Sequence, residues 1–175
     1  MYNSEKLTTT PQKTSAIALG SNLGDSQVTL EAALKTLDQT SGIRVKTYSS
    51  WYVTAPIGGP AEQPSYLNGC ALLEVEQTPQ ELLQTLLAIE DQFGRVRQER
   101  WGPRTLDLDL LLFEDLILDT PHLQIPHPRM TQRAFVLVPL AEIAPDWIEP
   151  VSREAISQLV EKVDCSGVTL FIERN

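Results

Sequence analysis

The segment at residues 104–113, RTLDLDLLLF, alternates apolar and acidic side chains over most of its length. A period of two is typical of a β-strand, because successive side chains project to opposite faces of the sheet. The segment therefore predicts a strand that keeps Asp107 and Asp109 together on one face and turns the other face to a core. The residues expected on the core face are Leu106, Leu108, Leu110 and Leu112.

The remaining patterns predict the partners of this strand. Runs rich in β-branched, aromatic or alternating residues predict strands at 15–19, 43–54, 66–76 and 168–172. Amphipathic helices are expected after Asp25, between Thr78 and Phe93, and at 153–163. The order β-α-β-β-α-β, with a C-terminal appendage, predicts an α+β fold. We expect a ferredoxin-like α/β sandwich, mainly an antiparallel sheet with helices packed on one face.

Length and composition favour a single cytoplasmic domain. The 175 residues fit one core, and we expect a flexible tail at 1–13 followed by one domain at 14–175. No apolar run approaches the ~20 residues of a membrane span. Cys70 and Cys165 lack metal-ligand spacing and are interpreted as free thiols. The net charge of −9 argues against binding to nucleic acid or to an anionic membrane.

The arginines are concentrated in one part of this acidic chain. Six of the nine lie within residues 95–133: Arg95, Arg97, Arg100, Arg104, Arg129 and Arg133. Arginine suits phosphate recognition because its planar guanidinium donates two parallel hydrogen bonds. The cluster is consistent with an anion site; the alternative is a solvated loop of surface ion pairs.

Asp107 and Asp109 are candidate metal ligands. Mg²⁺ takes a few carboxylate oxygens and completes its octahedron with water and substrate phosphates. By themselves, two aspartates on a strand are a weak signal for metal binding, and the alternative is an exposed pair on a solvent-facing strand. Their position after an arginine-rich segment favours a metal–triphosphate site and phosphoryl-type transfer. His127, between two prolines, is either a phosphate contact or a structural residue.

Residues 100–109, RWGPRTLDLD, resemble very closely the signature of 6-hydroxymethyl-7,8-dihydropterin pyrophosphokinases. The similarity extends over about residues 15–148. It includes further short motifs that follow one another in the same order along the chain: GSNL at 20–23, SSWY at 49–52, QPSYLN at 63–68, GRVR at 94–97, IPHPR at 125–129 and RAF at 133–135. This resemblance implies transfer of the β,γ-diphosphate of ATP to a reduced pterin, with AMP as the second product, in tetrahydrofolate biosynthesis.

The resemblance also implies roles for individual residues. Asp107 and Asp109 would hold two Mg²⁺ ions, and Arg95 and Arg104 would join them as catalytic residues. ATP, the co-substrate, would contact Glu90, Arg97, Trp101, Leu110, His127 and Arg133. The pterin would contact Gly20, Thr54, Pro56, Ile57, Tyr66, Asn68, Trp101 and Phe135.

The residues alone leave alternatives for the pterin positions. Tyr66 and Phe135 are also consistent with ordinary core packing, Asn68 with a structural role, and Gly20 with a simple turn. Pro128 and Leu87 depart from some relatives at nucleotide-side positions. Two rival functions use similar features: a nucleotidyltransferase that releases pyrophosphate, and a ligand-sensing module without activity. We expect a monomer, with a dimer as the alternative.

Overall fold

The computed structural model describes residues 11–55, 64–94 and 105–173. Its main sheet contains β1 (Lys13–Ser21), β2 (Ile43–Tyr48), β3 (Tyr52–Thr54), β4 (Tyr66–Val75), β5 (Asp107–Phe113) and β10 (Val168–Leu170). The helices are α1 (Ser26–Asp38), α2 (Pro79–Gln92), α3 (Ala134–Ile143) and α4 (Ile156–Glu161), with a 3₁₀ turn at Met130–Gln132. Two small hairpins are formed by β6 (Leu118–Asp119) with β7 (Gln124–Ile125) and by β8 (Ile148–Glu149) with β9 (Glu154–Ala155).

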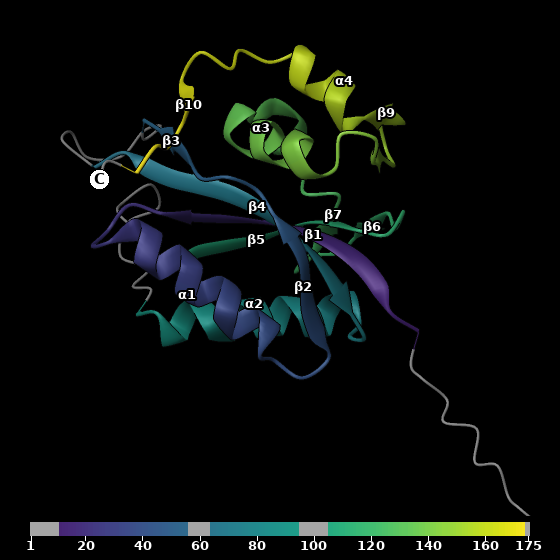
Figure 1. Cartoon of the computed structure of the whole chain (residues 1–175). Coiled ribbons are helices and arrows are strands. Elements are labelled where there is room, and N and C mark those ends of the chain that lie inside the picture. Colours follow the sequence, from purple (N-terminus) through teal and green to yellow (C-terminus); the bar gives the residue numbers. More distant parts are fainter. Residues whose placement is uncertain (1–10, 56–63, 95–104, 174–175) are drawn as a thin grey trace, which may run out of the picture.

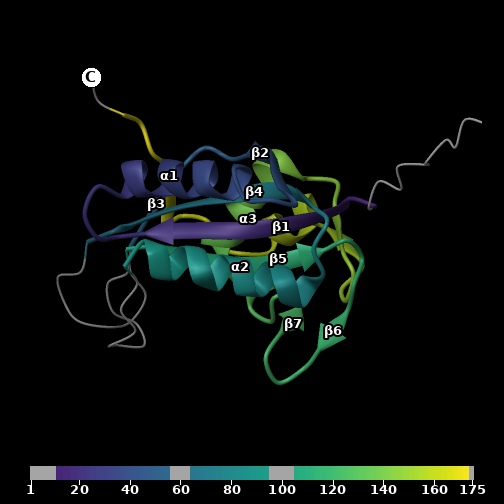
Figure 2. The same ribbon diagram turned by 90° about the horizontal axis from the view of Figure 1, so that it is seen from below.

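The six-stranded sheet has helices on both faces, as Figures 1 and 2 show. Its strands follow the order β10-β3-β4-β1-β5, and β2 also pairs with β4, beside β3. Every pairing between these strands is antiparallel. The α+β sandwich with a mainly antiparallel sheet is confirmed. The expectation of helices on one face alone is wrong, because α3 and α4 from the C-terminal part cover the face opposite α1 and α2 (Figure 1).

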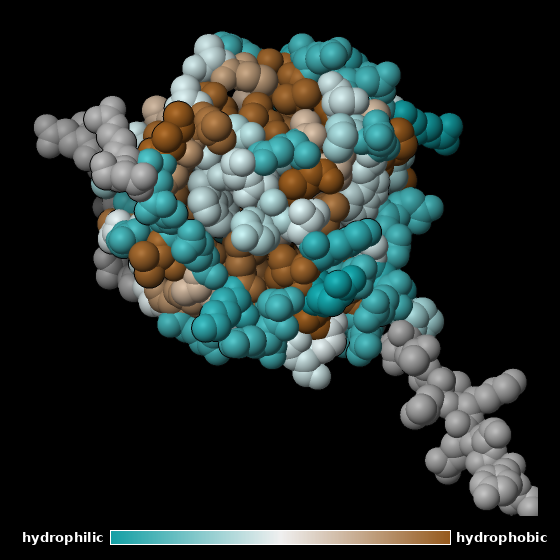
Figure 3. All heavy atoms as spheres, viewed as in Figure 1, coloured by the Kyte–Doolittle hydropathy of each residue, from teal (hydrophilic) through white to brown (hydrophobic). Residues whose placement is uncertain are grey.

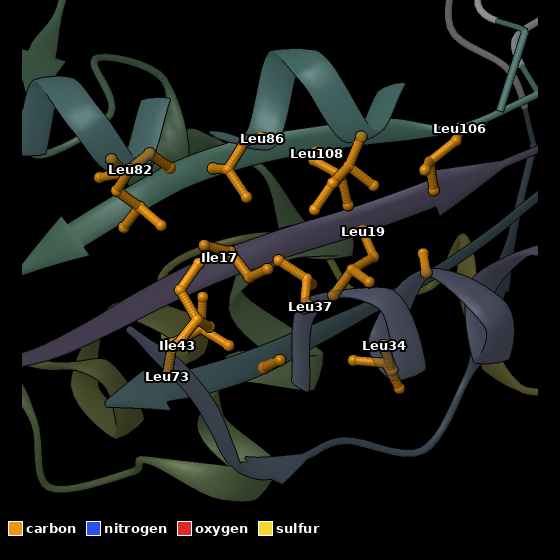
Figure 4. Packing of buried hydrophobic residues seen from close by; sticks show 14 of the residues in the cluster. Ile17, Leu19, Leu34, Leu37, Ile43, Leu73, Leu82, Leu86, Leu106 and Leu108 are labelled. Carbon is orange, nitrogen blue, oxygen red and sulfur yellow. The ribbon is translucent and has the colours of Figure 1, made fainter. Parts of the chain in front are cut away.

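Each face of the sheet has its own hydrophobic core. The core under α1 and α2 is shown in Figure 4, where leucines of the helices meet those of the strands. Its fully buried members include Ile17, Leu19, Leu37, Leu82, Leu86 and Leu106. A second cluster lies under α3 and α4 and includes Cys70, Leu72, Leu137 and Leu140. Burying each such side chain contributes roughly 1.5–3 kcal/mol, so both layers hold the central strands in register.

Helix α2 begins and ends where the sequence predicts. The side chain of Thr78 accepts a hydrogen bond from the backbone N–H of Glu81, and Pro79 occupies the first helical turn. Gly94 has a φ of +74°, a left-handed conformation that glycine adopts without strain. These ends fix the register of the helix, and with it the side on which Glu90 lies.

A β-bulge changes the predicted faces of β5. In the pairing with β1, Leu110 lies opposite Ile17 but Leu112 lies opposite Ala16, so Leu111 is an extra residue. Leu108 and Leu110 therefore pack in the α1/α2 core, whereas Leu111 and Leu112 pack under α3. The expectation that Leu112 shares a face with Leu108 is wrong beyond the bulge.

The segment predicted as one strand at 43–54 is two strands separated by a short break, Ser49–Trp51. Strands β2 and β3 run in the same direction and pair with successive parts of β4. The Ser49 backbone N–H donates to the carbonyl of Cys70, and the Ser49 hydroxyl accepts from the Cys70 N–H, both at 2.9 Å. Trp51 is buried over Gly69, where a Cβ would lie 2.5 Å from the indole ring.

The surface offers no long apolar helix. Within residues 11–55, 64–94 and 105–173, no helix has the length and apolar content to cross a membrane. Polar and apolar side chains are interspersed on the face shown in Figure 3.

Candidate functional site

Four residues on four neighbouring strands lie in one row across the sheet. Asp107 of β5 pairs with Gly20 of β1, and Gly20 pairs on its other side with Asn68 of β4. Asn68 in turn pairs with Tyr52 of β3. Residues directly opposite in antiparallel strands project to the same face. The row therefore brings a carboxylate, an amide and a phenol to one face of the sheet.

This face is the one that α3 covers. Cys70 lies two residues after Asn68 on β4, so both side chains project to the same side. The Cys70 thiol is buried under α3, 3.5 Å from the carbonyl oxygen of Val136. The side chains of the row consequently project from the sheet toward the layer that contains α3.

Gly20 makes room for the amide of Asn68. A Cβ at Gly20 would lie 2.8 Å from Asn68 Oδ1, well inside van der Waals contact. The Asn68 amide nitrogen donates to the hydroxyl of Thr54 at 2.7 Å, and both side chains are buried. An amide fixed in this way presents an ordered donor–acceptor edge, as recognition of a heterocycle requires.

Tyr66 and Phe135 belong to two layers, the sheet and helix α3, which packs on the face of the row. Tyr66 begins β4, two residues before Asn68, and is half-buried. Phe135 is half-buried in the first turn of α3. The guanidinium of Arg133 lies over the Phe135 ring, 5.5 Å from its centre. Aromatic side chains from a strand and from the helix above it can border a flat ligand.

Asp107 and Asp109 share a face, as the alternation predicts. Both are half-buried, while Leu108 between them is buried on the opposite face. Asp109 pairs with Ala18, one row further along β1 than Gly20. The two carboxylates therefore stand in successive rows beside the Asn68 amide.

Glu90 ties helix α2 to the aspartate strand. Its carboxylate is buried, and Oε2 accepts a hydrogen bond of 2.9 Å from the backbone N–H of Leu108. This N–H lies at the edge of the sheet that β1 does not cover. Glu90 is thus a polar residue on an otherwise apolar stripe of α2, because its carboxylate accepts the hydrogen bond of the Leu108 N–H, between the two aspartates of β5.

A pocket of about 750 Å³ opens beside this edge. Helix α2, strand β5 and the segment around β6 and β7 form its walls. The residues that line it are Leu83, Leu87, Glu90, Leu108, Asp109, Leu110, Asp119, Thr120, Pro121, His122, Leu123, Gln124, His127 and Pro128. Apolar side chains line one part and polar side chains another, and the size suits a nucleotide-sized ligand.

His127 faces this pocket as a neutral hydrogen-bond donor. Its backbone N–H donates to the Leu111 carbonyl at 2.9 Å, which anchors it to β5. Burial, and then the charges of Arg133 and Arg129, lower the pKa of His127 to about 4. Nδ1 accepts from the backbone N–H of Arg129 at 3.2 Å. The ring proton is therefore on Nε2, which suits donation to a phosphate oxygen.

The carboxylate pair fits a phosphate-bound magnesium better than a protein-only metal site. Among the described residues, no group of three or more His, Cys, Asp and Glu side chains is arranged to hold a metal. Mg²⁺ in phosphate-transfer sites usually takes one or two carboxylates, with water and phosphate as the other ligands. Asp109, which lines the pocket, and Asp107, two residues before it on the same face, are both partly exposed and supply oxygens that such a complex could use.

A comparison with family models shows to which family the chain belongs. Residues 16–145 match the model of the family described as 7,8-dihydro-6-hydroxymethylpterin-pyrophosphokinase (HPPK). The chain belongs to this family. The match includes both aspartates, the row and the whole described pocket.

Curated relatives and solved structures agree with the HPPK family. A Synechocystis sp. protein is 54% identical over 152 residues, covering 87% of this chain and 77% of the relative. A Pseudomonas aeruginosa protein is 48% identical over 137 residues, covering 78% and 84%. Both are named 2-amino-4-hydroxy-6-hydroxymethyldihydropteridine pyrophosphokinase.

Among solved structures, the Plasmodium falciparum HPPK-DHPS S436F/A437G/A613S triple mutant with SDX-DHP has a TM-score of 0.71 at 15% identity. The match covers 87% of this chain and 42% of that one, so the chain spans less than half of the matched structure. At this identity the likeness shows a shared HPPK fold.

The site predicted from sequence is partly within the described residues. On the strands, Gly20, Thr54, Tyr66, Asn68, Asp107 and Asp109 lie on one face of the sheet, and Glu90, Leu110 and His127 line the pocket. Phe135 is on α3, which packs on that face. Arg133 lies next to Phe135. The predicted residues Pro56, Ile57, Arg95, Arg97, Trp101 and Arg104 lie outside the described residues. The pocket adds residues that the sequence did not indicate, including Leu83, Thr120, His122 and Gln124. They lie on separate elements and carry no motif of their own.

Proposed function

We propose that this HPPK-family enzyme transfers the β,γ-diphosphate of ATP to 6-hydroxymethyl-7,8-dihydropterin, a step of tetrahydrofolate biosynthesis. The hydroxymethyl oxygen attacks the β-phosphorus, and a new P–O bond forms. The P–O bond to the α-phosphate breaks, and AMP leaves with the electron pair. The hydroxyl proton is released to solvent. Pterin diphosphate and AMP form in equal amounts.

The observation that carries this proposal is the position of Asp109 between two parts of the site. Asp109 lines the 750 Å³ pocket, and it also stands on the face of the Asp107–Asn68 row. A nucleotide in the pocket would place its phosphates at the carboxylates. A pterin over Asn68 would bring its hydroxymethyl group to the same place. Strand β5 would thus hold the reacting groups of both substrates close together, and in-line transfer requires this proximity.

The pterin slot is assigned to the covered face of the sheet. Asn68, oriented by Thr54, would read the polar edge of the pterin ring, and Gly20 gives that edge access. Tyr66 and Phe135 would stack on the ring from the sheet and helix layers. By the resemblance to the family, Pro56, Ile57 and Trp101 would contact the same substrate.

The phosphates would be bound by charge and hydrogen bonds from several elements. Asp107 and Asp109 would hold Mg²⁺, for which we propose two ions that neutralise charge on the triphosphate. His127 would donate from Nε2, and because it is neutral it supplies a hydrogen bond rather than a charge. By the resemblance to the family, Arg95, Arg97, Arg104 and Arg133 would surround the phosphates.

The products distinguish this reaction from its rivals. Purified protein would be incubated with ATP, MgCl₂ and 6-hydroxymethyl-7,8-dihydropterin, and nucleotides would be separated by anion-exchange chromatography. AMP and pterin diphosphate in a 1:1 ratio are expected, and chelation of the metal should stop their formation. ADP would indicate an ordinary kinase, pyrophosphate a nucleotidyltransferase, and unchanged ATP a binding module. Each of these three results would contradict the proposal.

We also propose that the enzyme acts as a cytoplasmic monomer with a single domain after an N-terminal tail. The expected boundary between residues 13 and 14 moves by one residue, because Lys13 already belongs to β1 and pairs with Val75. Light scattering during size-exclusion chromatography would test the oligomeric state, and removal of the tail should leave the product ratio unchanged.

A further inference from the structure

We propose that Glu142 is a positioning residue of the pterin slot, because its carboxylate holds strand β3 to helix α3. The inference rests on the proposed function, since the slot is the one assigned to the pterin. Glu142 itself lies outside the row and touches neither the carboxylate pair nor the pocket lining.

The Glu142 carboxylate receives hydrogen bonds from two residues near β3. Oε1 accepts from the Ser50 backbone N–H at 3.0 Å and from the Ser50 hydroxyl at 2.7 Å. Oε2 accepts from the Tyr52 hydroxyl at 2.6 Å and from the Ser50 N–H at 3.2 Å. We call Glu142, Ser50 and Tyr52 the β3 clamp.

The β3 clamp connects the two layers that border the slot. Phe135 and Glu142 are both on α3, seven residues and about 10 Å apart, and positions with this spacing lie on one side of a helix. Tyr52 pairs with Asn68, and Thr54 of the same short strand binds the Asn68 amide. Glu142 thus links the helix that carries Phe135 to the strand that orients Asn68.

Strand β3 is only three residues long, so its pairings with β4 on one side and β10 on the other are short, and the tie to α3 adds to them. It follows the break at Ser49–Trp51, and residues 56–63 lie outside the described part of the chain. Trp51, between the two clamped residues, is buried on the opposite side, against the α1/α2 core. The strand is thereby held on one face by Trp51 and on the other by the β3 clamp.

The protonation states favour strong bonds in the clamp. Burial, and then Glu142, raise the pKa of Tyr52 to about 12, so the phenol remains a donor. Although burial opposes ionisation of Glu142, hydrogen bonds from Tyr52 and Ser50 hold the pKa of this carboxylate below its ordinary value. Hydrogen bonds to an ionised acceptor are about twice as strong as those between neutral groups.

The test compares Glu142→Ala and Glu142→Gln with the wild-type enzyme, measuring the KM of the pterin, the KM of ATP, kcat and thermal stability. Glu142→Ala should raise the pterin KM about tenfold and leave the ATP KM within about twofold. Glu142→Gln keeps one acceptor oxygen, so its pterin KM should lie between those of the wild type and Glu142→Ala. As a single change, Tyr52→Phe should raise the pterin KM. In the Glu142→Ala background it should cause no further rise in that KM.

Two controls match these changes. Glu154→Gln removes a carboxylate that pairs with Lys162 at the far end of the C-terminal layer. Tyr48→Phe removes the hydroxyl of an exposed tyrosine on β2. Both should leave the pterin KM at the wild-type value. If Glu142→Ala does not fold, Ser50→Ala and Tyr52→Phe replace it, each removing donors but keeping the carboxylate.

The possible failures are distinguishable. Wild-type enzyme that forms no AMP would contradict the proposed function and this inference together. An active wild type with an unchanged pterin KM in Glu142→Ala, or in the replacement pair, would contradict the inference alone. Equal losses for ATP and pterin, or the same loss in Glu154→Gln, would also contradict it, because they would indicate general destabilisation.

Discussion

Gly20 and Asn68 face each other across strands β1 and β4, and the missing side chain of one accommodates the amide of the other. A Cβ at Gly20 would lie only 2.8 Å from Asn68 Oδ1, which leaves no room for a methyl group. On the other side of Gly20 stands Asp107. The glycine therefore opens a path along the row between the amide and the carboxylate, and it does so without a strained backbone, since no positive φ occurs there.

We predict that Gly20→Ala weakens pterin binding while the protein remains folded. The obstructed atom is the end of a flexible side chain, so the amide can move at small cost to stability, on the order of 1 kcal/mol or less. The displaced amide would no longer present its polar edge to the ring. Calorimetry should show pterin affinity reduced about tenfold or more, with ATP affinity nearly unchanged.

Gly167→Ala is the matched control for this change. A Cβ there would meet no atom within 4 Å, and its backbone is not in the left-handed region. It should bind the pterin like the wild type. Wild-type affinity in Gly20→Ala as well would show that the Asn68 amide is not the recognition group.

Gly69→Ala should act on stability instead, because the obstructed group is rigid. A Cβ at Gly69 would lie 2.5 Å from two ring atoms of Trp51, which is buried between strand β4 and the α1/α2 core. Overpacking of this kind costs about 1–3 kcal/mol, and for a chain of this size roughly 2–4 °C of Tm per kcal/mol. Thermal unfolding would measure the loss.

A second substitution makes the cause of that loss testable. Trp51→Leu in the Gly69→Ala background should cost less than Trp51→Leu in the wild type, because the smaller side chain removes the clash. If the two costs are equal, the instability of Gly69→Ala has another origin.

The sequence predicted the fold where one local pattern decided the structure. The Thr78 and Gly94 signals gave the ends of α2, and the alternation gave the common face of Asp107 and Asp109. The break at Ser49–Trp51 was not predicted, because the residues on either side of it, Thr47, Tyr48 and Tyr52–Thr54, all have high β-propensity. The bulge at Leu111 was not predicted either, since an extra apolar residue in an apolar run has no signal of its own.

Much of the site depends on contacts between distant segments, which one sequence does not reveal. Gln124 and Leu83 line the same pocket from a hairpin and from helix α2. Glu142 and Tyr52 are joined across 90 residues by a hydrogen bond between helix α3 and strand β3. Such residues carry no shared motif, so their proximity follows only from the topology.

His127 should remain neutral down to acidic pH, which gives stability a defined pH dependence. Its pKa is about 4 in the folded protein and 6.5 as the ordinary value. Between these values the unfolded chain binds more protons than the folded chain, so this group's contribution to stability is complete above about pH 6.5 and is lost as the pH falls toward 4. Urea unfolding at several pH values should show stability rising across this window. In His127→Gln that slope should be smaller.

NMR titration of the imidazole provides a direct check. The chain has two histidines, so the His122→Gln variant leaves one and assigns the signal to His127. A midpoint near 6.5 would contradict the buried, neutral ring and the assignment of its proton to Nε2.

The last prediction is that replacing either aspartate of the carboxylate pair lowers the catalytic rate while the protein stays folded. Asp107→Asn and Asp109→Asn keep the size and shape of each side chain but remove the charge that would hold Mg²⁺. Because both residues project from the polar face of β5, while Leu108 and Leu110 fill the core on the other face, the free energy of unfolding should change by no more than about 1 kcal/mol. We expect kcat to fall at least about a hundredfold in each variant, since phosphoryl-type transfer depends mainly on positioning and on charge neutralisation.

The measurement is AMP formation over a series of MgCl₂ concentrations, with Asp119→Asn as control, because Asp119 also lines the pocket but lies outside the row. Saturating Mg²⁺ that restores near-wild-type kcat in both variants would show that neither carboxylate is needed in the transition state. A loss confined to the apparent affinity for Mg²⁺ would assign the aspartates to metal recruitment alone.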